Sequence, residues 1–274
     1  MTTTGSTIPA PYIHFAEELA DASRKLIRSR FRQRTEVEMK PDDTPVTRTD
    51  LEVEALLRDM IADRYPSHGV IGEEHPDSAA GADLVWVIDP IDGTRSFIAG
   101  RPVFGTLIAL TLDAQPVLGV VDIPIMNERW VGAKGYATLL NGQPTTTRRC
   151  PAASNAILLA TSPEYLDGDA ARPFGNVAER AKFTIYDAGT QAYGLVASGH
   201  ADIMIAARYG IVDYLAAVPV IEGAGGLMRD WTGAPLTLHS GDRFVAVGDP
   251  QLLPEALELL DQAQTGRASH VERA

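Results

Sequence analysis

Two aspartates stand three residues apart at the end of an apolar run, in the sequence WVIDPIDGT at residues 86–94. Pro90 pushes Asp89 toward extended backbone and ends the predicted strand there, and a helix is expected to begin just after Asp92. Two carboxylates on one tight turn repel each other unless a cation relieves the repulsion. Oxygen ligands favour Mg²⁺ or Ca²⁺ over zinc, and a helix start offers backbone N–H groups to a phosphate. The stretch therefore predicts a site for a divalent cation and a phosphate group.

Asp-Pro and Asp-Gly are also ordinary turn dipeptides, and aspartate is a good helix N-cap, so the aspartate pair alone also fits a structural role. Further carboxylates favour the cation site. The sequence GEE at residues 72–74 follows another short apolar strand, and Asp50 stands at a predicted helix start. Asp213 is expected to open a helix that is apolar on most sides, where an acid is costly unless it is capped or paired with a cation.

The overall charge of the chain is acidic. Its 274 residues carry 24 Lys and Arg against 36 Asp and Glu, a formal net charge of −12. Nucleic acids and anionic membranes reward a basic surface, so the charge argues against both as partners. Hydrophobic residues make up 45% of the sequence, which is typical of a folded protein and too apolar for disorder.

Several features predict a cytoplasmic protein. Cys150 is the only cysteine, so the sequence forms no internal disulfide and no cysteine zinc site. Residues 1–11 lack the basic and apolar regions of a signal peptide, and they and residues 264–274 are expected to be loose tails. No stretch approaches the roughly 18 consecutive apolar residues of a membrane span.

Hydrophobic periodicity predicts two halves of different character, residues 1–150 and residues 151–274. The first half is expected to be α+β with a mostly antiparallel sheet, and its second helix to start at Thr49, where Thr49 and Glu52 fit a capping box. The second half alternates strands and helices, as in a layered α/β arrangement. Helices are predicted at residues 12–34, from 49 to 65, 191–198, 213–222 and 254–263, and strands at 70–72, 84–88, 106–112, 117–122, 156–160, 183–186, 202–206 and 244–247.

Other chemical motifs are weak. The sequence GAGG at residues 223–226 follows a predicted helix and suits its C-terminal end better than a dinucleotide-binding turn. The six histidines show no metal or catalytic-triad spacing, and no G-x-S-x-G esterase motif occurs.

The motifs together resemble the inositol monophosphatase superfamily of Mg²⁺-dependent, lithium-sensitive phosphatases. The resemblance covers about residues 12–263. It implies a layered α-β-α-β-α sandwich of the inositol monophosphatase and fructose-1,6-bisphosphatase type, with the site between the two halves, and a homodimer. The matching stretches are Lys40, PVTRTD at residues 45–50, GEE at 72–74, WVIDPIDGT at 86–94, and Asp213 followed ten residues later by GAGG at 223–226.

The resemblance implies two or three Mg²⁺ ions in each site. Glu73, Asp89 and the Ile91 carbonyl would bind the first ion. Asp89, Asp92 and Asp213 would bind the second, and Glu73 would help to hold a third, weaker one. One ion would lower the pKa of the attacking water and another would stabilise the leaving oxygen.

The resemblance also implies which residues act on the water and the phosphate. Asp50 and Thr94 would orient the attacking water, with Glu73 beside them in the catalytic group. The backbone N–H groups of Gly93 and Thr94 would hold the phosphate.

The alcohol half of the substrate, a small phosphorylated metabolite, would lie against Asp92, Asp213 and the loop Gly189, Thr190 and Gln191. Within the superfamily the sequence is most similar to the histidinol-phosphatase branch, above all in DYLAAVPVIEGAGG at residues 213–226. Typical inositol phosphatases place Trp directly before the metal aspartate, where this chain has Val212.

One position departs from both branches. Seven residues before Asp213 they carry a glutamate that contacts the substrate, and this chain has Ala206, with Arg208 nearby. Losing such an acceptor would weaken a hydroxyl- or ammonium-bearing ligand by ~1–3 kcal/mol. Histidinol phosphate is the leading substrate; inositol monophosphate, or another polyol or nucleotide phosphate, is the alternative. A phosphatase-derived protein that binds a metabolite without hydrolysing it fits less well, because all predicted metal carboxylates and Thr94 are present.

Overall fold

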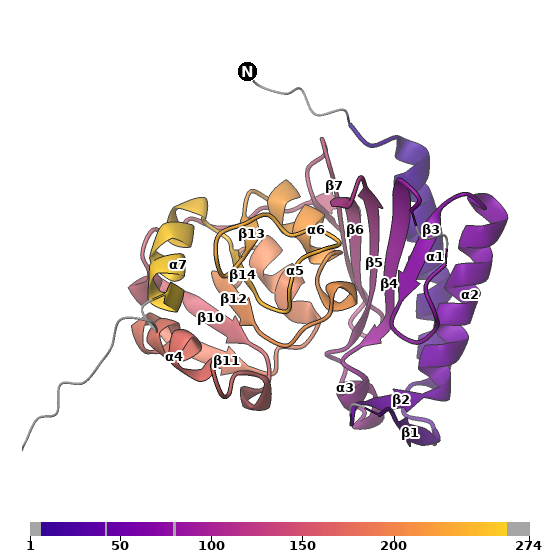
Figure 1. The fold of residues 1–274 in the computed structure, drawn as a ribbon, viewed down its shortest axis with the longest axis horizontal. Coiled ribbons are helices and arrows are strands. Elements are labelled where there is room, and N and C mark those ends of the chain that lie inside the picture. The colour runs from indigo at the N-terminus through magenta and orange to yellow at the C-terminus, as the bar shows by residue number, and fades with distance from the viewer. Residues whose placement is uncertain (1–6, 42, 79–80, 262–274) are drawn as a thin grey trace, which may run out of the picture.

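The computed structural model describes residues 7–41, 43–78 and 81–261, which form five layers (Figure 1). Two helices cover one face of a large sheet, two more fill the space between this sheet and a smaller one, and two others cover the smaller sheet from outside. The α+β composition and the α-β-α-β-α layering expected from the sequence are confirmed. The α-helices are α1 (Ala10–Arg30), α2 (Arg48–Arg64), α3 (Thr94–Ile98), α4 (Ala171–Arg180), α5 (Gln191–Ala197), α6 (Ala217–Gly223) and α7 (Leu253–Asp261).

The large sheet has seven strands in the order β3-β4-β5-β6-β7-β8-β9. Only β3 and β4 run parallel, and every later pair is antiparallel, as the sequence predicts. Its two apolar faces alternate along each strand: Trp86 and Ile88 of β4 face α1 and α2, whereas Val85 and Val87 face α5 and α6. The strands are β3 (Gly69–Gly72), β4 (Leu84–Asp92), β5 (Gly105–Leu112), β6 (Gln115–Ile123), β7 (Glu128–Ala133), β8 (Leu139–Leu140) and β9 (Gln143–Pro144).

The smaller sheet has five strands in the order β11-β10-β12-β14-β13. Its inner face packs on α5 and α6, and its outer face packs on α4 and α7. The strands are β10 (Ile157–Ala160), β11 (Phe183–Tyr186), β12 (Ile203–Ala206), β13 (Leu227–Asp230) and β14 (Phe244–Val247). A separate two-stranded sheet pairs β1 (Val37–Met39) with β2 (Pro45–Thr47), and short 3₁₀ helices are η1 (Ala153–Asn155), η2 (Pro163–Tyr165), η3 (Ile211–Asp213) and η4 (Pro250–Leu252).

Three of the predicted element ends that are wrong lie at predicted site residues, whereas elsewhere α1 ends at Arg30 rather than at residue 34. The N-cap of α2 is Thr47 rather than Thr49, and its capping box is completed by Asp50. Strand β4 does not stop at Asp89 but continues to Asp92, because its pairing with β5 is interrupted between Asp89 and Asp92, where Pro90 has no N–H to donate. Asp213 ends η3, and the buried helix α6 begins four residues later at Ala217.

Several elements of the described residues were not predicted, among them the short strands β1, β2 and β9, helix α4 and strand β13. Helix α4 contains Pro173 and Gly175, which weaken its helical signal, and β13 is a four-residue strand with one fully buried side chain. The expected loose tail at residues 7–11 is also wrong, because Ile8 is buried and α1 already starts at Ala10. Residues 1–6 and 264–274 lie outside the described residues.

The two sheets divide the chain near the predicted boundary, with β3–β9 between residues 69 and 144 and β10–β14 between residues 157 and 247. Because α5 and α6 pack against both sheets, the division into domains 1–150 and 151–274 stays a prediction. None of the helices within the described ranges combines the length and the apolar character that crossing a bilayer requires.

Candidate active site

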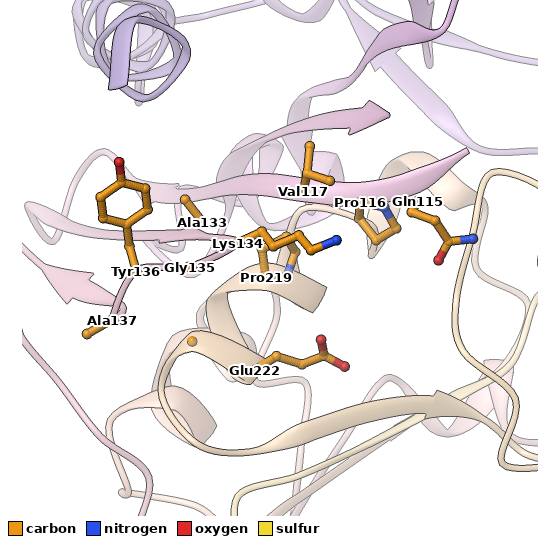
Figure 2. Close-up of a pocket in the computed structure, with 11 residues that line it drawn as sticks. Gln115, Pro116, Val117, Ala133, Lys134, Gly135, Tyr136, Ala137, Pro219 and Glu222 are labelled. Atoms are coloured by element: carbon orange, nitrogen blue, oxygen red, sulfur yellow. The ribbon is translucent and has the colours of Figure 1, made fainter. Parts of the chain in front are cut away.

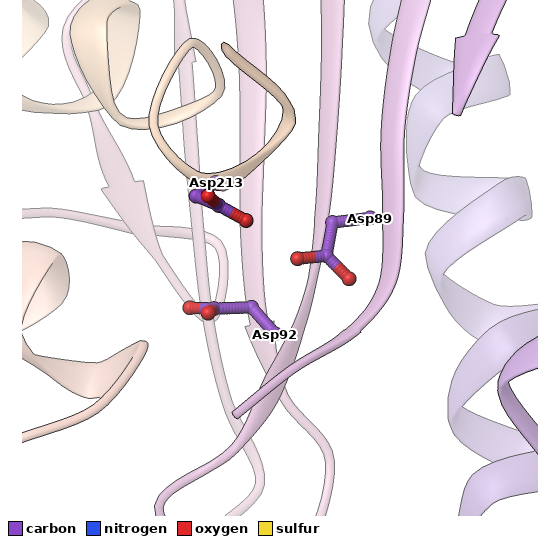
Figure 3. A group of neighbouring side chains, drawn as sticks. All are labelled: Asp89, Asp92 and Asp213. Atoms are coloured by element: carbon purple, nitrogen blue, oxygen red, sulfur yellow. The ribbon is translucent and has the colours of Figure 1, made fainter. Parts of the chain in front are cut away.

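Three of the predicted ligand carboxylates meet where the two sheets approach each other. Each of Asp89, Asp92 and Asp213 contributes an oxygen, and these oxygens lie within 4.8 Å of one another (Figure 3). Asp89 is buried, whereas Asp92 and Asp213 are half-buried. The cluster joins the end of β4 to η3, residues that are 121 positions apart in the chain.

Hydrogen bonds fix two of these three residues, Asp89 and Asp213. Asp89 Oδ1 accepts from the Ile91 N–H at 3.0 Å, which turns the chain across the break in β4. Asp213 Oδ2 accepts from the Gly210 N–H at 2.6 Å, and Asp213 O accepts from the buried Tyr193 hydroxyl at 2.7 Å. The cluster is therefore preorganised by its supporting contacts.

The electrostatics of the cluster favour a cation. Burial, followed by the charges of Glu73, Asp92 and Asp213, raises the pKa of Asp89 well above its usual value. Burial and the charges of Asp92 and Glu73 do the same to the pKa of Asp213. Burial also raises the pKa of Asp92 to about 7, although a hydrogen bond with Thr190 opposes the shift. A hard divalent cation would remove this repulsion, and the all-oxygen donor set fits Mg²⁺.

Glu73 lies beside the cluster and, unlike the three aspartates, forms an ion pair within the described part of the chain. Its Oε1 accepts from Lys40 Nζ at 2.8 Å, and the same ammonium donates to Glu74 Oε1 at 2.8 Å. Burial alone would lower the pKa of Lys40, but the two carboxylates outweigh it and raise that pKa. Glu73 thus holds an ion pair, while its charge still acts on Asp89.

Asp50 and Thr94 lie together, as predicted for a water-orienting pair. Thr94 Oγ1 is 3.2 Å from Asp50 Oδ1 and 3.1 Å from the Ile91 carbonyl oxygen, and its one proton can be donated to either. Asp50 Oδ2 accepts from the Thr47 N–H at 3.0 Å and from the Thr47 hydroxyl at 2.5 Å. Burial raises the pKa of Asp50, and these hydrogen bonds oppose the rise.

The predicted phosphate cradle lies at the first turn of α3. Gly93 is its N-cap with φ +88°, a left-handed conformation that an L side chain rarely adopts. The Gly93 and Thr94 N–H groups stand where helical bonding leaves donors without a partner. Their position is the one that the sequence predicts for a phosphate site.

The loop at Gly189, Thr190 and Gln191 touches the same region from the second half. Thr190 Oγ1 donates to the Asp92 carbonyl at 2.9 Å, so the loop is attached directly to the end of β4. Gly189 has φ +58° and approaches Val103 so closely that a Cβ would lie 2.2 Å from its carbonyl oxygen. Gln191 Nε2 donates to Glu128 Oε2 at 2.7 Å, and this bond occupies the amide predicted to contact the alcohol.

Comparisons with known proteins agree with this geometry. The model of the "Inositol monophosphatase family" matches residues 9–265. The chain belongs to this family. It is 43% identical to the bifunctional phosphatase IMPL2, chloroplastic, of Arabidopsis thaliana, over 89% of this chain and 73% of that protein. It is 35% identical to the histidinol-phosphatase of Chlorobaculum parvum, over 81% and 87% of the two chains.

A solved structure gives the same result. An inositol monophosphatase from Zymomonas mobilis aligns with a TM-score of 0.85 and 39% identity, covering 93% of this chain and all (100%) of that one. The inositol monophosphatase family consists of metal-dependent phosphatases that act on small phosphorylated substrates. The three-carboxylate cluster is where this member of the family can bind a metal.

Sequence reasoning missed the residues that support the site. Tyr193 and Gly210 hydrogen-bond to Asp213, and neither belongs to a motif that the sequence showed. A separate hollow of about 610 Å³ lies at the other end of the large sheet, between β6, β7 and α6 (Figure 2). It is lined by Gln115, Pro116, Val117, Ala133, Lys134, Gly135, Tyr136, Ala137, Pro219, Glu222 and Gly223, and none of these is a predicted site residue.

The raised pKa values predict how the metal-free protein responds to pH. A carboxyl group with a higher pKa in the folded state stabilises the fold at low pH, and this contribution is lost as the pH rises through the folded pKa. Asp92 and Glu74, both with a pKa of about 7, place that loss between about pH 4 and pH 7.

We therefore expect Asp92 and Glu74 to lower the Tm of the metal-free protein as the pH rises to neutrality. Mg²⁺ should raise the Tm again at the upper end of this range, since it binds the ionised carboxylates. Scanning calorimetry in EDTA and in Mg²⁺ measures both effects. An Mg²⁺-induced rise in Tm as large at about pH 4 as at neutral pH would contradict the assignment.

Proposed function

We propose that this protein hydrolyses a phosphate monoester with Mg²⁺ at the Asp89, Asp92 and Asp213 cluster. The convergence of these carboxylates within 4.8 Å is the observation that carries the proposal. The family membership supports it, since the family consists of metal-dependent phosphatases.

Asp89, Asp92 and Asp213 would hold Mg²⁺ together, and Glu73 and the Ile91 carbonyl would complete the set for two or three ions. When bound, Mg²⁺ lowers the pKa of a water and neutralises charge on the phosphate and the leaving oxygen. Glu73 would first have to give up part of its ion pair with Lys40, which lies 2.8 Å away.

Asp50 and Thr94 would orient the attacking water. Asp50 is fixed by two bonds from Thr47, so its Oδ1 draws the Thr94 hydroxyl proton. A lone pair of Thr94 Oγ1 is then free to accept a hydrogen bond from the water, which would point the water oxygen toward the phosphorus. The N–H groups of Gly93 and Thr94 would bind the phosphate oxygens during this step.

We propose histidinol phosphate as the substrate. The histidinol-phosphatase of Chlorobaculum parvum is 35% identical to this chain, and the chain carries the DYLAAVPVIEGAGG sequence typical of that branch at residues 213–226. The alcohol would lie against Asp92, Asp213 and the loop at 189–191. Ala206 is buried in the layer between the two sheets, so recognition of the alcohol depends on other groups.

An inositol monophosphate is the second candidate. The inositol monophosphatase from Zymomonas mobilis is 39% identical to this chain over its whole length, which is a closer match than the Chlorobaculum parvum enzyme gives. The two candidates require the same metal cluster, so only turnover separates them.

Phosphate release in Mg²⁺ should therefore be compared among histidinol phosphate, inositol 1-phosphate, fructose 1,6-bisphosphate and a 3′-phosphonucleotide. We expect kcat/KM for histidinol phosphate to exceed that for inositol 1-phosphate by about tenfold or more. Inositol 1-phosphate as the best substrate would overturn the histidinol phosphate proposal and leave the reaction type intact. Release from none of the four would refute both.

The homodimer and the cytoplasmic location stay predictions. Sedimentation velocity of the purified chain tests the first, and a mass of one protomer at micromolar concentration would contradict it.

A further inference from the structure

Glu54 on α2 is a buried carboxylate that no motif identified. Its side chain has no exposed surface, and it contacts the chain directly after Gly72. Glu54 Oε2 accepts from the Glu74 N–H at 2.7 Å, and Oε1 accepts from the His75 N–H at 3.1 Å. One carboxylate therefore binds two successive backbone donors.

Arg58 completes this contact one helical turn later. Its Nε donates to Glu54 Oε1 at 2.7 Å, and its terminal nitrogen donates to the His75 carbonyl at 3.0 Å. Burying a carboxylate is costly without such a partner, and Arg58 supplies Glu54 with a cationic one.

The strand end approaches these two side chains closely. A Cβ on Gly72 would lie 2.2 Å from Glu54 Oε1 and 2.7 Å from an Arg58 nitrogen. Only glycine therefore lets β3 run this close to α2. The backbone therefore contacts Glu54 on both sides of Glu73, at Gly72 before it and at the Glu74 and His75 N–H groups after it.

Glu73 lies between Gly72, which packs against Glu54, and the two N–H groups that donate to Glu54. Its charge acts on Asp89, Asp92 and Asp213, so its position relative to them matters for any cation there. The same helix carries Asp50, four residues before Glu54 and so on the same face. Helix α2 thus contacts both the water-orienting pair and the Glu73 loop.

We propose that Glu54, held by Arg58, is the positioning residue that fixes Glu73 beside the three-aspartate cluster for cation binding. This inference rests on the proposed function, because it assumes that Mg²⁺ binds at the cluster. Glu54 itself touches neither the metal nor the substrate. Its hydrogen bonds set the direction in which the backbone presents Glu73.

Glu54→Gln is the mildest test, since glutamine keeps the size but places an N–H₂ group against a backbone donor. We expect Mg²⁺ binding to the metal-free protein, measured by calorimetry, to weaken about tenfold. We also expect the amides of Glu74 and His75 to exchange with deuterium about tenfold faster, because they lose a charged acceptor. Glu52→Gln is the matched control on the same helix: Glu52 bonds the exposed Arg48, so both readouts should stay unchanged.

A purely structural role is separated by repeating the change in a Glu73→Gln background. If Glu54 acts through Glu73, Glu54→Gln should weaken Mg²⁺ binding by no more than about twofold there. An equal loss in both backgrounds, or faster exchange without weaker Mg²⁺ binding, overturns the inference. If Glu54→Gln does not fold, Arg58→Lys, which keeps the charge but not the forked contact, is measured in the same way.

The failure of this inference differs from the failure of the proposed function. Unaltered Mg²⁺ binding in Glu54→Gln, together with lost binding in Asp89→Asn, overturns only the role of Glu54. Unaltered binding in Asp89→Asn overturns the metal site and both proposals with it.

Discussion

Asp89→Asn is expected to lower Mg²⁺-dependent phosphate release by on the order of 10²–10³-fold or more, because it removes a charged ligand at the centre of the cluster. Asp89 is the most buried of the three carboxylates. The negative charges of Glu73, Asp92 and Asp213 all act on it. Phosphate release at saturating substrate and increasing Mg²⁺ measures the loss.

The same substitution should stabilise the metal-free protein. A neutral amide removes the burial cost and the repulsion that together raise the pKa of Asp89, so the Tm in EDTA should rise while the Tm in Mg²⁺ falls. These opposite shifts exclude misfolding as the cause of lost activity. Asp59→Asn, an exposed aspartate on α2, is the control and should change neither quantity. Full turnover in Asp89→Asn would refute the metal assignment.

The sequence pattern was sufficient to predict the pair Asp89 and Asp92, because they lie at the end of a strongly patterned element. The apolar run before Asp89 has to be a buried strand, and the carboxylates that follow it can only lie at its end. Asp213 required the resemblance as well, since nothing local in η3 indicates that it faces β4. The layers were predictable for the same reason, as strand and helix periodicities are local.

Exact element boundaries at the site were not predictable from local rules. Two capping patterns overlap at the start of α2, one with Thr47 and Asp50 and one with Thr49 and Glu52. Both satisfy the same rule, and the structure uses the first, in which Asp50 also contacts Thr94, 44 residues away in the chain. Pro90 ends a strand by the local rule, but the break in pairing with β5 lets β4 continue.

The contact of Glu54 shows the same limit more strongly. Its sequence neighbourhood is an ordinary charged helix, and Glu54 with Arg58 reads as an exposed i,i+4 pair. Only packing of β3 against α2 buries the pair and gives it backbone partners. Supporting residues of this kind follow from tertiary contacts rather than from residue types.

Thr94→Val is expected to lower kcat by about 10²–10³-fold and to leave Mg²⁺ binding within about twofold of the wild type. Valine matches threonine in shape but has no hydroxyl, so Asp50 Oδ1 and the Ile91 carbonyl lose the donor that lies 3.2 and 3.1 Å away. The attacking water then loses the group that orients it. Single-turnover phosphate release and calorimetric Mg²⁺ titration measure the two quantities separately.

Thr94→Ser keeps the hydroxyl and is the matched control, so it should retain most of the activity. Asp50→Asn is less clean, because Asp50 also completes the capping box of α2, and loss of a cap costs about 0.5–2 kcal/mol of stability. If Thr94 acts through Asp50, the double variant should be little slower than Thr94→Val alone, as expected for residues that act as a unit. Multiplicative losses would show that the two residues act on the water independently. Near-normal turnover in Thr94→Val would instead assign the Thr94 hydroxyl to the local structure of α3.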